Sequence, residues 1–435
     1  MFTDPPAEQV RDQEPRPVKR GWCPDLLHPM PTGDGLLVRL HAALGRLTAG
    51  QLGAIAAAAQ SCGNGLIDVS GRGNLQIRGV CEHSYPMLVE ALAAAGLADL
   101  APRHTVVSPL AGHDSVDHID AAELALQVEA ALRTIERLPA KLAVVVDGGG
   151  LFPLLDLDAE IYVVAVSPRT IAIGLAAAEG PRWCGTAPPA ELPSALIAML
   201  TGFTEAVSDG KLSAMRSASS VLRAKLVAAA RLGPPAAPSP RPSAPRAGIV
   251  RLPDGGAAVV LALPFGRCDA DRLMRITGWA ERFGSGEVRL SPWRGVVIPK
   301  LRRQYLATLV ELASGAGLIS DPRDPRLAVF ACPGRPECAS ASVMTRRDAA
   351  RLAAAARPLL QTGGEIHISG CTKGCAHSGP AALTLVGDKG NYRVIVEGTP
   401  HDPGVSRLGI DEIERHLKSV ETRADLASRF SAAGG

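Results

Sequence analysis

The sequence predicts an α/β (α+β) fold in which one structural unit occurs twice, with pseudo-twofold symmetry. Residues 63–80, GNGLIDVSGRGNLQIRGV, are similar to residues 284–301, GSGEVRLSPWRGVVIPKL, when Ser70 is aligned with Ser291. A strand pattern and a helical stretch precede each segment, so each unit reads strand–helix–strand. Between the halves, residues 233–248 are rich in proline and small residues, which predicts an extended, disordered spacer.

The repeat continues further along each half. The segment PRHTVVSP parallels PRLAVFACP and places Ser108 opposite Cys332, while KLAVVVD parallels EIHISGC and places Asp147 opposite Cys371. The two pairs have the same separation along the chain, and it is nearly that of Ser70 and Ser291. Four matching segments at almost one offset indicate an internal duplication in which only the second copy carries cysteines at the matched positions 332 and 371.

Composition excludes several classes of protein. A chain of 435 residues with 46% hydrophobic residues can form two to four domains with substantial cores. A net charge of +3 and the absence of a dense Lys/Arg run argue against nucleic-acid binding. Residues 1–20 are polar and proline-rich, so we expect a flexible leader rather than a signal peptide, and no apolar run is long enough to span a membrane. Nine cysteines in such a chain indicate the reducing cytoplasm.

Four of these cysteines form two close pairs: Cys332 and Cys338 in CPGRPEC, and Cys371 and Cys375 in GCTKGC. Disulfides are rare in a chain without an export signal. Structural zinc usually takes cysteines two to four residues apart, and the first pair is spaced more widely. An iron–sulfur cluster tolerates the wider spacing because each thiolate binds a different iron. The spacing therefore favours a [4Fe–4S] cluster over zinc.

Several motifs in the chain resemble the sirohaem-containing sulfite and nitrite reductase family. Ser-x-Arg-x-Asn-x-Gln-x-Arg at 70–78 is similar to the strand that contacts the tetrapyrrole in that family. Arg103 followed by SPLAG, and LPAK ending at Lys141, match two further motifs, the second of which brings a lysine to the substrate. Two features depart from the family: Ala143 stands where a second lysine is usual, and the last cysteine loop reads CTKGC instead of CPN-x-C.

That variant loop, together with GWCPDLLHPMPTGDGLLVRL at 21–40, resembles instead the precorrin-3B synthases of aerobic cobalamin (vitamin B12) biosynthesis, a family within the same superfamily. The resemblance implies an oxidoreductase, an O2-dependent monooxygenase. Such an enzyme hydroxylates precorrin-3A at C20 and closes a γ-lactone from the ring A acetate to C1. It also implies a [4Fe–4S] cluster, a mononuclear non-haem iron, no sirohaem, and an external electron donor such as NADH acting through a reductase. We expect a cytoplasmic monomer.

The resemblance also implies a domain plan for the nitrite/sulfite reductase-like fold. It has two ferredoxin-like half-domains and two cluster-type α/β domains, of which only the second binds a cluster. The expected segments are a leader (1–20), the first half-domain (21–100), a cluster-type domain without cysteine ligands (101–232), the linker (233–248), the second half-domain (249–320) and the cluster domain (321–435).

The substrate of such an enzyme carries many acetate and propionate groups, which arginine binds best through two parallel hydrogen bonds. The residues expected to face the macrocycle are Arg39, Arg72, Asn74, Gln76, Arg78, Arg103, Lys141 and Arg294. In a strand of period two, Arg72, Asn74, Gln76 and Arg78 share one face, which could equally be an ordinary solvated face.

No catalytic residue is assigned, and Lys141 and His377 are the candidates. Non-haem iron often binds two histidines and one carboxylate. The candidate ligands are His104, His113, His367, His377, Asp114, Asp117 and Asp147. Two other functions stay open. A sirohaem-dependent assimilatory sulfite or nitrite reductase would bind a chlorin-like group. A non-catalytic iron–sulfur protein would bind the tetrapyrrole without turnover.

Overall fold

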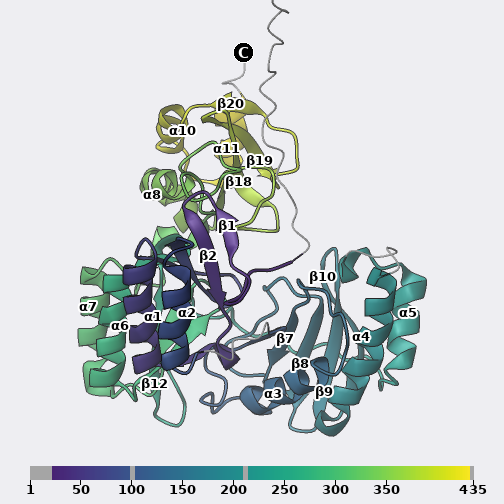
Figure 1. Cartoon of the computed structure of the whole chain (residues 1–435). Helices are drawn as coiled ribbons and strands as arrows, with labels where there is room; N and C mark the ends of the chain where they lie inside the picture. The colour runs from purple at the N-terminus through teal and green to yellow at the C-terminus, as the bar shows by residue number, and fades with distance from the viewer. Residues whose placement is uncertain (1–21, 98–102, 209–213, 432–435) are drawn as a thin grey trace, which may run out of the picture. The chain divides into compact units, whose positions relative to one another are not determined.

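The structure, a computed structural model, describes residues 22–97, 103–208 and 214–431. Residues 22–327 form one compact unit and residues 328–431 belong to a second, and each is described by itself (Figure 1). The expected leader, 1–20, lies outside the described residues. No helix in the described ranges combines the length and the apolar character that crossing a membrane requires.

The first half-domain is a sheet covered on one face by two helices. Its elements are β1 (Met30–Thr32), β2 (Gly35–Leu40), α1 (Ala49–Cys62), β4 (Leu66–Val69), β5 (Leu75–Val80) and α2 (Tyr85–Ala94). The side chain of Thr48 accepts a hydrogen bond from the Gln51 N–H, and the Gln51 side chain accepts one from the Thr48 N–H, so a capping box begins α1. The strands are antiparallel, in the order β1-β2-β5-β4.

The second half-domain repeats this arrangement. Its elements are β11 (Gly248–Arg251), β12 (Ala257–Ala262), α6 (Ala270–Phe283), β14 (Glu287–Ser291), β15 (Gly295–Ile298) and α7 (Leu306–Gly315). The strand order β11-β12-β15-β14 is that of the first half. Even the backbone distortions recur, because Leu44 (φ 55°) and Phe265 (φ 53°) take the same left-handed conformation at equivalent positions of the repeat.

Each half-domain donates one short strand to the sheet of the other. Strand β3 (Arg46–Thr48) of the first half pairs with β14, and β13 (Arg267–Asp269) of the second half pairs with β4, both antiparallel. Each sheet therefore has five strands, one of them from the other half. Three-residue strands carry no pattern of their own, so the sequence did not predict this exchange.

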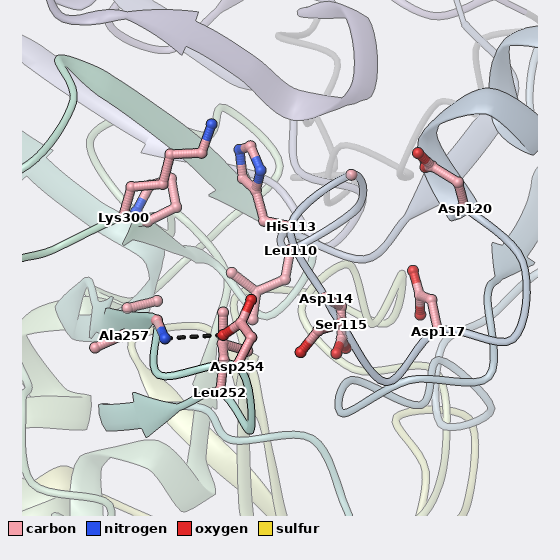
Figure 2. Close-up of a pocket in the computed structure, with 14 residues that line it drawn as sticks. Leu110, His113, Asp114, Ser115, Asp117, Asp120, Leu252, Asp254, Ala257 and Lys300 are labelled. Carbon is pink, nitrogen blue, oxygen red and sulfur yellow. Dashed lines mark hydrogen bonds between the residues drawn. The ribbon is translucent and has the colours of Figure 1, made fainter.

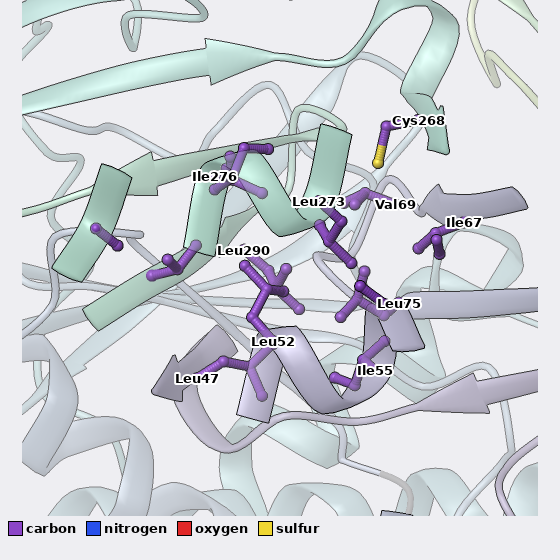
Figure 3. Packing of buried hydrophobic residues seen from close by; sticks show 14 of the residues in the cluster. Leu47, Leu52, Ile55, Ile67, Val69, Leu75, Cys268, Leu273, Ile276 and Leu290 are labelled. Atoms are coloured by element: carbon purple, nitrogen blue, oxygen red, sulfur yellow. The ribbon is translucent and has the colours of Figure 1, made fainter. Parts of the chain in front are cut away.

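A single core lies between the two halves. Helices α1 and α6 pack against each other, and their side chains Leu52, Ile55, Leu273 and Ile276 are fully buried, together with Leu290 and other strand residues around them (Figure 3). The two half-domains therefore share their main hydrophobic core.

The cluster-type domain without cysteine ligands forms a third sheet in the same unit. Its elements are β6 (Thr105–Val107), α3 (Ala121–Leu132), β7 (Val144–Asp147), β8 (Ile161–Ser167), β9 (Thr170–Ala177), β10 (Gly180–Ala187), α4 (Leu192–Ser208) and α5 (Ser220–Ala229). Strands β6, β7 and β8 are parallel, and β9 and β10 are antiparallel additions. Helix α4 contacts both α3 and α5.

The second unit has the same sheet plan. Its elements are β16 (Val329–Ala331), α8 (Thr345–Ala355), α9 (Arg357–Gln361), β17 (Ile366–Ser369), β18 (Ala381–Asp388), β19 (Asn391–Gly398), β20 (Ser406–Leu408), α10 (Ile410–Leu417) and α11 (Arg423–Ser431). Strands β16, β17 and β18 are parallel, and β19 and β20 are antiparallel, as in the domain without cysteine ligands. The predicted duplicated α/β fold is confirmed.

The linker at 233–248 is extended, as predicted, but the prediction of a disordered spacer was wrong. Arg241 donates from Nη1 and Nη2 to the two carboxylate oxygens of Asp147, at 3.0 and 2.6 Å, and from Nη1 to the Gly150 carbonyl. Asp147 is buried, so this bidentate pair anchors the linker to the end of β7. The composition of the linker predicted its extended form, but it could not show that Arg241 would pair with the distant carboxylate of Asp147.

We expect Asp68→Ala to destabilise the protein by about 3–5 kcal/mol. Asp68 in β4 is 3% exposed and accepts hydrogen bonds from Arg267 of β13 at 2.8 and 3.2 Å, while Arg78 Nη1 lies 3.6 Å away. The substitution leaves two guanidinium groups without their shared carboxylate at the strand exchange. Chemical unfolding followed by circular dichroism measures the loss.

The matched control is Asp158→Ala. Asp158 pairs with Arg216 at the surface, where the two side chains are 50% and 45% exposed, so its removal should cost less than about 1 kcal/mol. Equal effects of the two substitutions would show that the exchanged strand is not held by Asp68.

Candidate functional site

The four predicted cluster cysteines lie in two loops that follow neighbouring parallel strands. Cys332 follows β16 and Cys371 follows β17. Because these neighbouring strands are parallel, the two cysteine loops leave the sheet at the same edge. The Gly370 N–H donates to Cys332 Sγ at 3.1 Å. Gly370 has no room for a side chain, since a Cβ there would lie 2.5 Å from the Ala341 Cβ. The backbone therefore approaches the sulfur closely, as hydrogen-bonded cluster sulfurs require.

The four thiols are close enough to influence one another. Burial raises the pKa of Cys371, and Cys338 and Cys332 raise it further, while the Lys373 backbone N–H opposes them. Although part of its side chain is exposed, desolvation raises the pKa of Cys375 to about 11, with Cys332, Cys371 and Cys338 contributing. Four thiolates crowded in this way need compensating positive charge, which the iron ions of a bound cluster would supply.

Within the described residues, no three His, Cys, Asp or Glu side chains form a group that could hold a single metal ion. The four cysteines nevertheless influence one another's pKa values. In a [4Fe–4S] cluster each cysteine binds its own iron, so the ligands lie further apart than in a zinc site. This arrangement fits the cluster, and no ligand set is assigned to a mononuclear iron.

His377 is held by aromatic contacts next to the cysteine loop. Its ring stacks on Phe330 with centroids 4.5 Å apart and meets His367 edge-on at 5.7 Å. Its Nε2 lies 3.3 Å from the Pro380 carbonyl oxygen. His367 is fully buried in β17. These two candidate iron ligands are neighbours in the second unit.

Of the other candidate iron ligands, all in the first unit, His113, Asp114 and Asp117 line one pocket, whereas His104 and Asp147 have partners elsewhere. His113 Nε2 lies 3.1 Å from Glu287 Oε1, in a network that also includes Arg289. His104 Nδ1 lies 3.3 Å from the Leu142 carbonyl oxygen. Asp147 pairs with Arg241 of the linker. The structure therefore brings three of the candidates together and places His104 and Asp147 in other local networks.

The predicted substrate residues Arg39 and Gln76 face each other across β2 and β5. When the amide oxygen of Gln76 points to Arg39, it accepts hydrogen bonds from Nε at 3.1 Å and Nη2 at 2.8 Å. Burial lowers the pKa of Arg39, and the charge of Arg72 lowers it further, against the opposing effect of the Cys23 thiol. Arg39 and Arg72 are therefore close enough to repel each other.

Arg72 is not in the strand, so the predicted polar strand face is only partly right. Ser70–Gly73 form a turn, in which Gly73 has φ 66°, and β5 begins at Leu75. Arg72 is exposed and donates to the Lys141 carbonyl at 2.8 Å and the Leu142 carbonyl at 3.4 Å. The turn thus brings Arg72 to the segment that carries Lys141, whose side chain is also exposed.

Arg78 lies in the interior instead of on a ligand-facing surface. Its side chain is 2% exposed and donates to Asp34 at 2.7 and 3.0 Å, and Asp68 lies near its third nitrogen. Two carboxylates therefore balance its charge. Because Arg78 is buried and its charge is already balanced, we remove it from the substrate-binding set. The sequence motif includes Arg78, but the spacing does not show that Asp34 and Asp68 are its partners.

The remaining predicted substrate residues lie at turns or loops. The Asn74 N–H donates to Ser70 Oγ, and Asn74 itself is half-buried just before β5. Arg294 occupies a left-handed turn position, with φ 63°, and its Nη2 lies 3.8 Å from where a Gly71 Cβ would be. Arg103 is half-buried, and its Nε has no hydrogen-bond partner among the described residues.

One residue near this set was not predicted. His41 directly follows β2 and is buried, and its burial and the charges of Arg39 and Arg103 lower its pKa. A single histidine at the end of a strand does not by itself indicate a binding residue. Its position could have done so, because residues two apart in an extended chain point to the same side, and His41 lies two residues after Arg39.

A pocket of about 510 Å³ lies elsewhere in the first unit, and no predicted substrate arginine lines it (Figure 2). Its wall carries Asp114, Asp117, Asp120 and Asp254, with His113 and Lys300 on the opposite side from Asp117. Burial raises the pKa of Asp117 to about 8, and Asp114 contributes to the rise. This acidic pocket is unsuited to a polycarboxylate ligand.

Comparisons with known proteins agree with the repeat. The family profile described as "Nitrite/Sulfite reductase ferredoxin-like half domain" matches residues 28–95 and again residues 250–314. These matches cover β1 to α2 and β12 to α7, with β11 in part, so the profile recognises both half-domains.

Similar whole proteins were also found. The chain is 34% identical over 395 residues to a precorrin-3B synthase from Sinorhizobium sp., covering 88% of this chain and 83% of that protein. It is 24% identical to the ferredoxin–nitrite reductase of Synechococcus elongatus, covering 88% and 81%. The solved structure of the Mycobacterium tuberculosis NirA protein has the same fold, with a TM-score of 0.70, 20% identity, and coverage of 88% and 79%.

We expect Cys332→Ser to remove the metal centre while leaving the fold intact. The serine oxygen can still accept the Gly370 N–H, but it is a poor ligand for iron. Iron and acid-labile sulfide in oxygen-free preparations should fall from about four of each per chain to near zero. Cys81→Ser, an exposed cysteine outside the group, should retain both. Zinc in place of iron in the unsubstituted protein would contradict the prediction.

Asp117→Asn should stabilise the protein increasingly as the pH rises. The folded-state pKa of about 8 lies above the ordinary value of 3.8, so ionising Asp117 opposes folding. The cost is absent below about pH 4 and complete above about pH 8. Because the side chain is partly exposed, we expect a gain of about 1–3 kcal/mol at pH 8.5 and almost none at pH 4.5. Chemical unfolding at several pH values measures the difference.

The control for this prediction is Asp254→Asn in the wall of the same pocket. Its oxygen would still accept the Gly256 N–H, so stability should change by less than about 0.5 kcal/mol at every pH. If the effect of Asp117→Asn on stability did not depend on pH, the pKa of Asp117 would be the same in the folded and unfolded protein, and the prediction would be wrong.

Proposed function

The chain belongs to the precorrin-3B synthase family, whose members share the nitrite/sulfite reductase-like fold, and from this membership we propose that it is an O2-dependent monooxygenase acting on precorrin-3A. The reaction places one oxygen atom on C20 and closes a γ-lactone from the ring A acetate to C1. The second oxygen atom leaves as water, with two electrons and two protons from an external donor. The observation that carries the proposal is the 34% identity over most of both chains.

The positions of the arginines support a polycarboxylate substrate. Arg39, Arg72 and Arg103 come from β2, the turn before β5 and the segment before β6, and Arg39 and Arg72 are near enough to lower the pKa of Arg39. Like charges held together without a carboxylate partner destabilise a folded protein, and an anionic ligand would relieve that cost. Lys141 lies beside Arg72 through its backbone. These cations would bind and orient the acetate and propionate groups.

The cysteine loops would hold a [4Fe–4S] cluster, with Cys332, Cys338, Cys371 and Cys375 as ligands. Such a cluster accepts and delivers electrons one at a time, which suits a reaction that needs two from outside. Lys373 lies between the last two ligands, and its charge opposes the rise in the pKa of Cys371 and Cys375 that burial causes. The protein would hold the four thiolates in place and donate backbone N–H groups to their sulfurs, as the Gly370 N–H does to Cys332 Sγ.

The second candidate is a sirohaem-dependent sulfite or nitrite reductase, which the fold and the nitrite reductase relatives favour. Reduction of a small oxyanion needs dense positive charge around the anion. Ala143, where a second lysine is usual in those reductases, is fully buried in the core of the third sheet. That position contributes no charge, so the oxyanion reaction is the weaker proposal.

The test of the proposed function is incubation of the oxygen-free, iron-loaded protein with precorrin-3A, a reductant and labelled O2. The product should gain one labelled oxygen atom by mass spectrometry, and omission of O2 should prevent the gain. A bound chlorin-like absorption band with reductant-dependent nitrite or sulfite consumption would instead establish the second candidate. Binding of precorrin-3A without any mass gain would identify a non-catalytic tetrapyrrole-binding protein.

A further inference from the structure

His41 is a buried histidine with unused hydrogen-bonding capacity. Its side chain is 5% exposed, and neither Nδ1 nor Nε2 has a hydrogen-bond partner among the described residues. Buried polar groups are nearly always paired, because leaving one unpaired costs about 1–3 kcal/mol. The fold therefore maintains a costly arrangement at this position, and a ligand that accepts a hydrogen bond would relieve the cost.

The surroundings of His41 are positively charged. Burial lowers its pKa to about 4, and Arg39 and Arg103 contribute to the decrease. The Pro24 backbone, which is near the imidazole without forming a hydrogen bond of normal geometry, and the charge of Asp25 oppose them. The imidazole is therefore neutral near pH 7 and has one N–H to donate. Arg103 Nε is likewise buried without a partner among the described residues. Two unused donors thus lie in one electropositive region that Arg39 extends.

The second half-domain shows that the fold does not need these polar groups. At the equivalent positions, when Ser70 is aligned with Ser291, it has Ala262 for His41 and Val260 for Arg39. Val260 faces Val297 as Arg39 faces Gln76. There the sheet face is closed by an apolar cluster that includes Leu110 and Phe152. Apolar residues therefore suffice for the sheet, and the polar set in the first half has another use.

We propose that His41 is a substrate-binding residue that donates a hydrogen bond to a carboxylate of the tetrapyrrole, which the Arg103 Nε–H also binds. This inference rests on the proposed function and deepens it, because it assigns one carboxylate of the substrate to a specific pair of donors. A neutral imidazole adds a donor without adding a third charge beside Arg39 and Arg103. A hydrogen bond from a neutral donor to a carboxylate is charge-assisted, and is therefore stronger than one between two neutral groups.

The test uses the full-length protein and uroporphyrin, a fluorescent tetrapyrrole whose side chains all end in carboxylates. His41→Leu and His41→Phe remove the donor and keep an apolar side chain, so each should raise the Kd by about tenfold or more. His41→Gln keeps an N–H donor and should remain within about threefold of the unsubstituted protein. His83→Leu, at an exposed histidine of the same half-domain, is the matched control and should not change the Kd.

A second measurement separates binding from folding. His41→Leu and His41→Phe replace two unpaired buried nitrogens by carbon, so the unfolding midpoint should not fall. In an Arg103→Ala background, His41→Leu should weaken binding much less than it does alone, since both donors serve the same carboxylate.

The outcomes distinguish the inference from the proposed function. If the unsubstituted protein does not bind uroporphyrin, the proposed tetrapyrrole site fails as a whole. If it binds, but a folded His41→Leu or His41→Phe variant binds equally tightly, the role of His41 is overturned. Full additivity of the His41 and Arg103 substitutions would also overturn it, because the two residues would then act on different groups.

Discussion

The reciprocal exchange of β3 and β13 is the constraint on which the rest of the first unit depends. Each sheet is complete only with a strand from the other half, and the buried ion pair between Asp68 and Arg267 fixes one of the two exchanges. The shared core between α1 and α6 follows from this, because the exchanged strands bring those helices together. The end of β2 and the turn before β5, which carry Arg39 and Arg72, are thereby positioned relative to one another, and the hydrogen bonds from Arg72 to the Lys141 and Leu142 carbonyls connect this turn to the third sheet.

Within this symmetric frame the two copies have different chemistry. The first half-domain keeps a polar sheet face with Arg39 and His41, whereas the second closes the same face with Val260 and apolar neighbours. Of the cluster-type domains, one has cysteines after its first two parallel strands. The other has Ser108 and Asp147 there, and Asp147 binds Arg241 of the linker. The duplicated shape is retained while the functional groups are not.

The sequence was sufficient for the features that repeat or follow a period. Four matched segments predicted the duplicated fold, and the two cysteine pairs predicted loops that the structure brings into electrostatic contact. It was insufficient where a partner comes from a distant segment. Arg78 belongs to an interior ion pair because of Asp34, and Arg72 leaves the strand because Gly73 permits a turn. His41 became apparent only through its burial and its lack of hydrogen bonds within the described part of the chain.

The strand exchange has a consequence for how the two copies could diverge. Two identical half-domains in separate polypeptides could form the same pairings as a symmetric homodimer, in which β3 of each would join the sheet of the other. Every substitution in such a homodimer would appear twice, so an arginine suited to a ligand on one side would also interrupt the apolar packing on the other. Joining the halves through residues 233–248 removes that restriction. Covalent fusion therefore allows a symmetric scaffold to bind an asymmetric molecule.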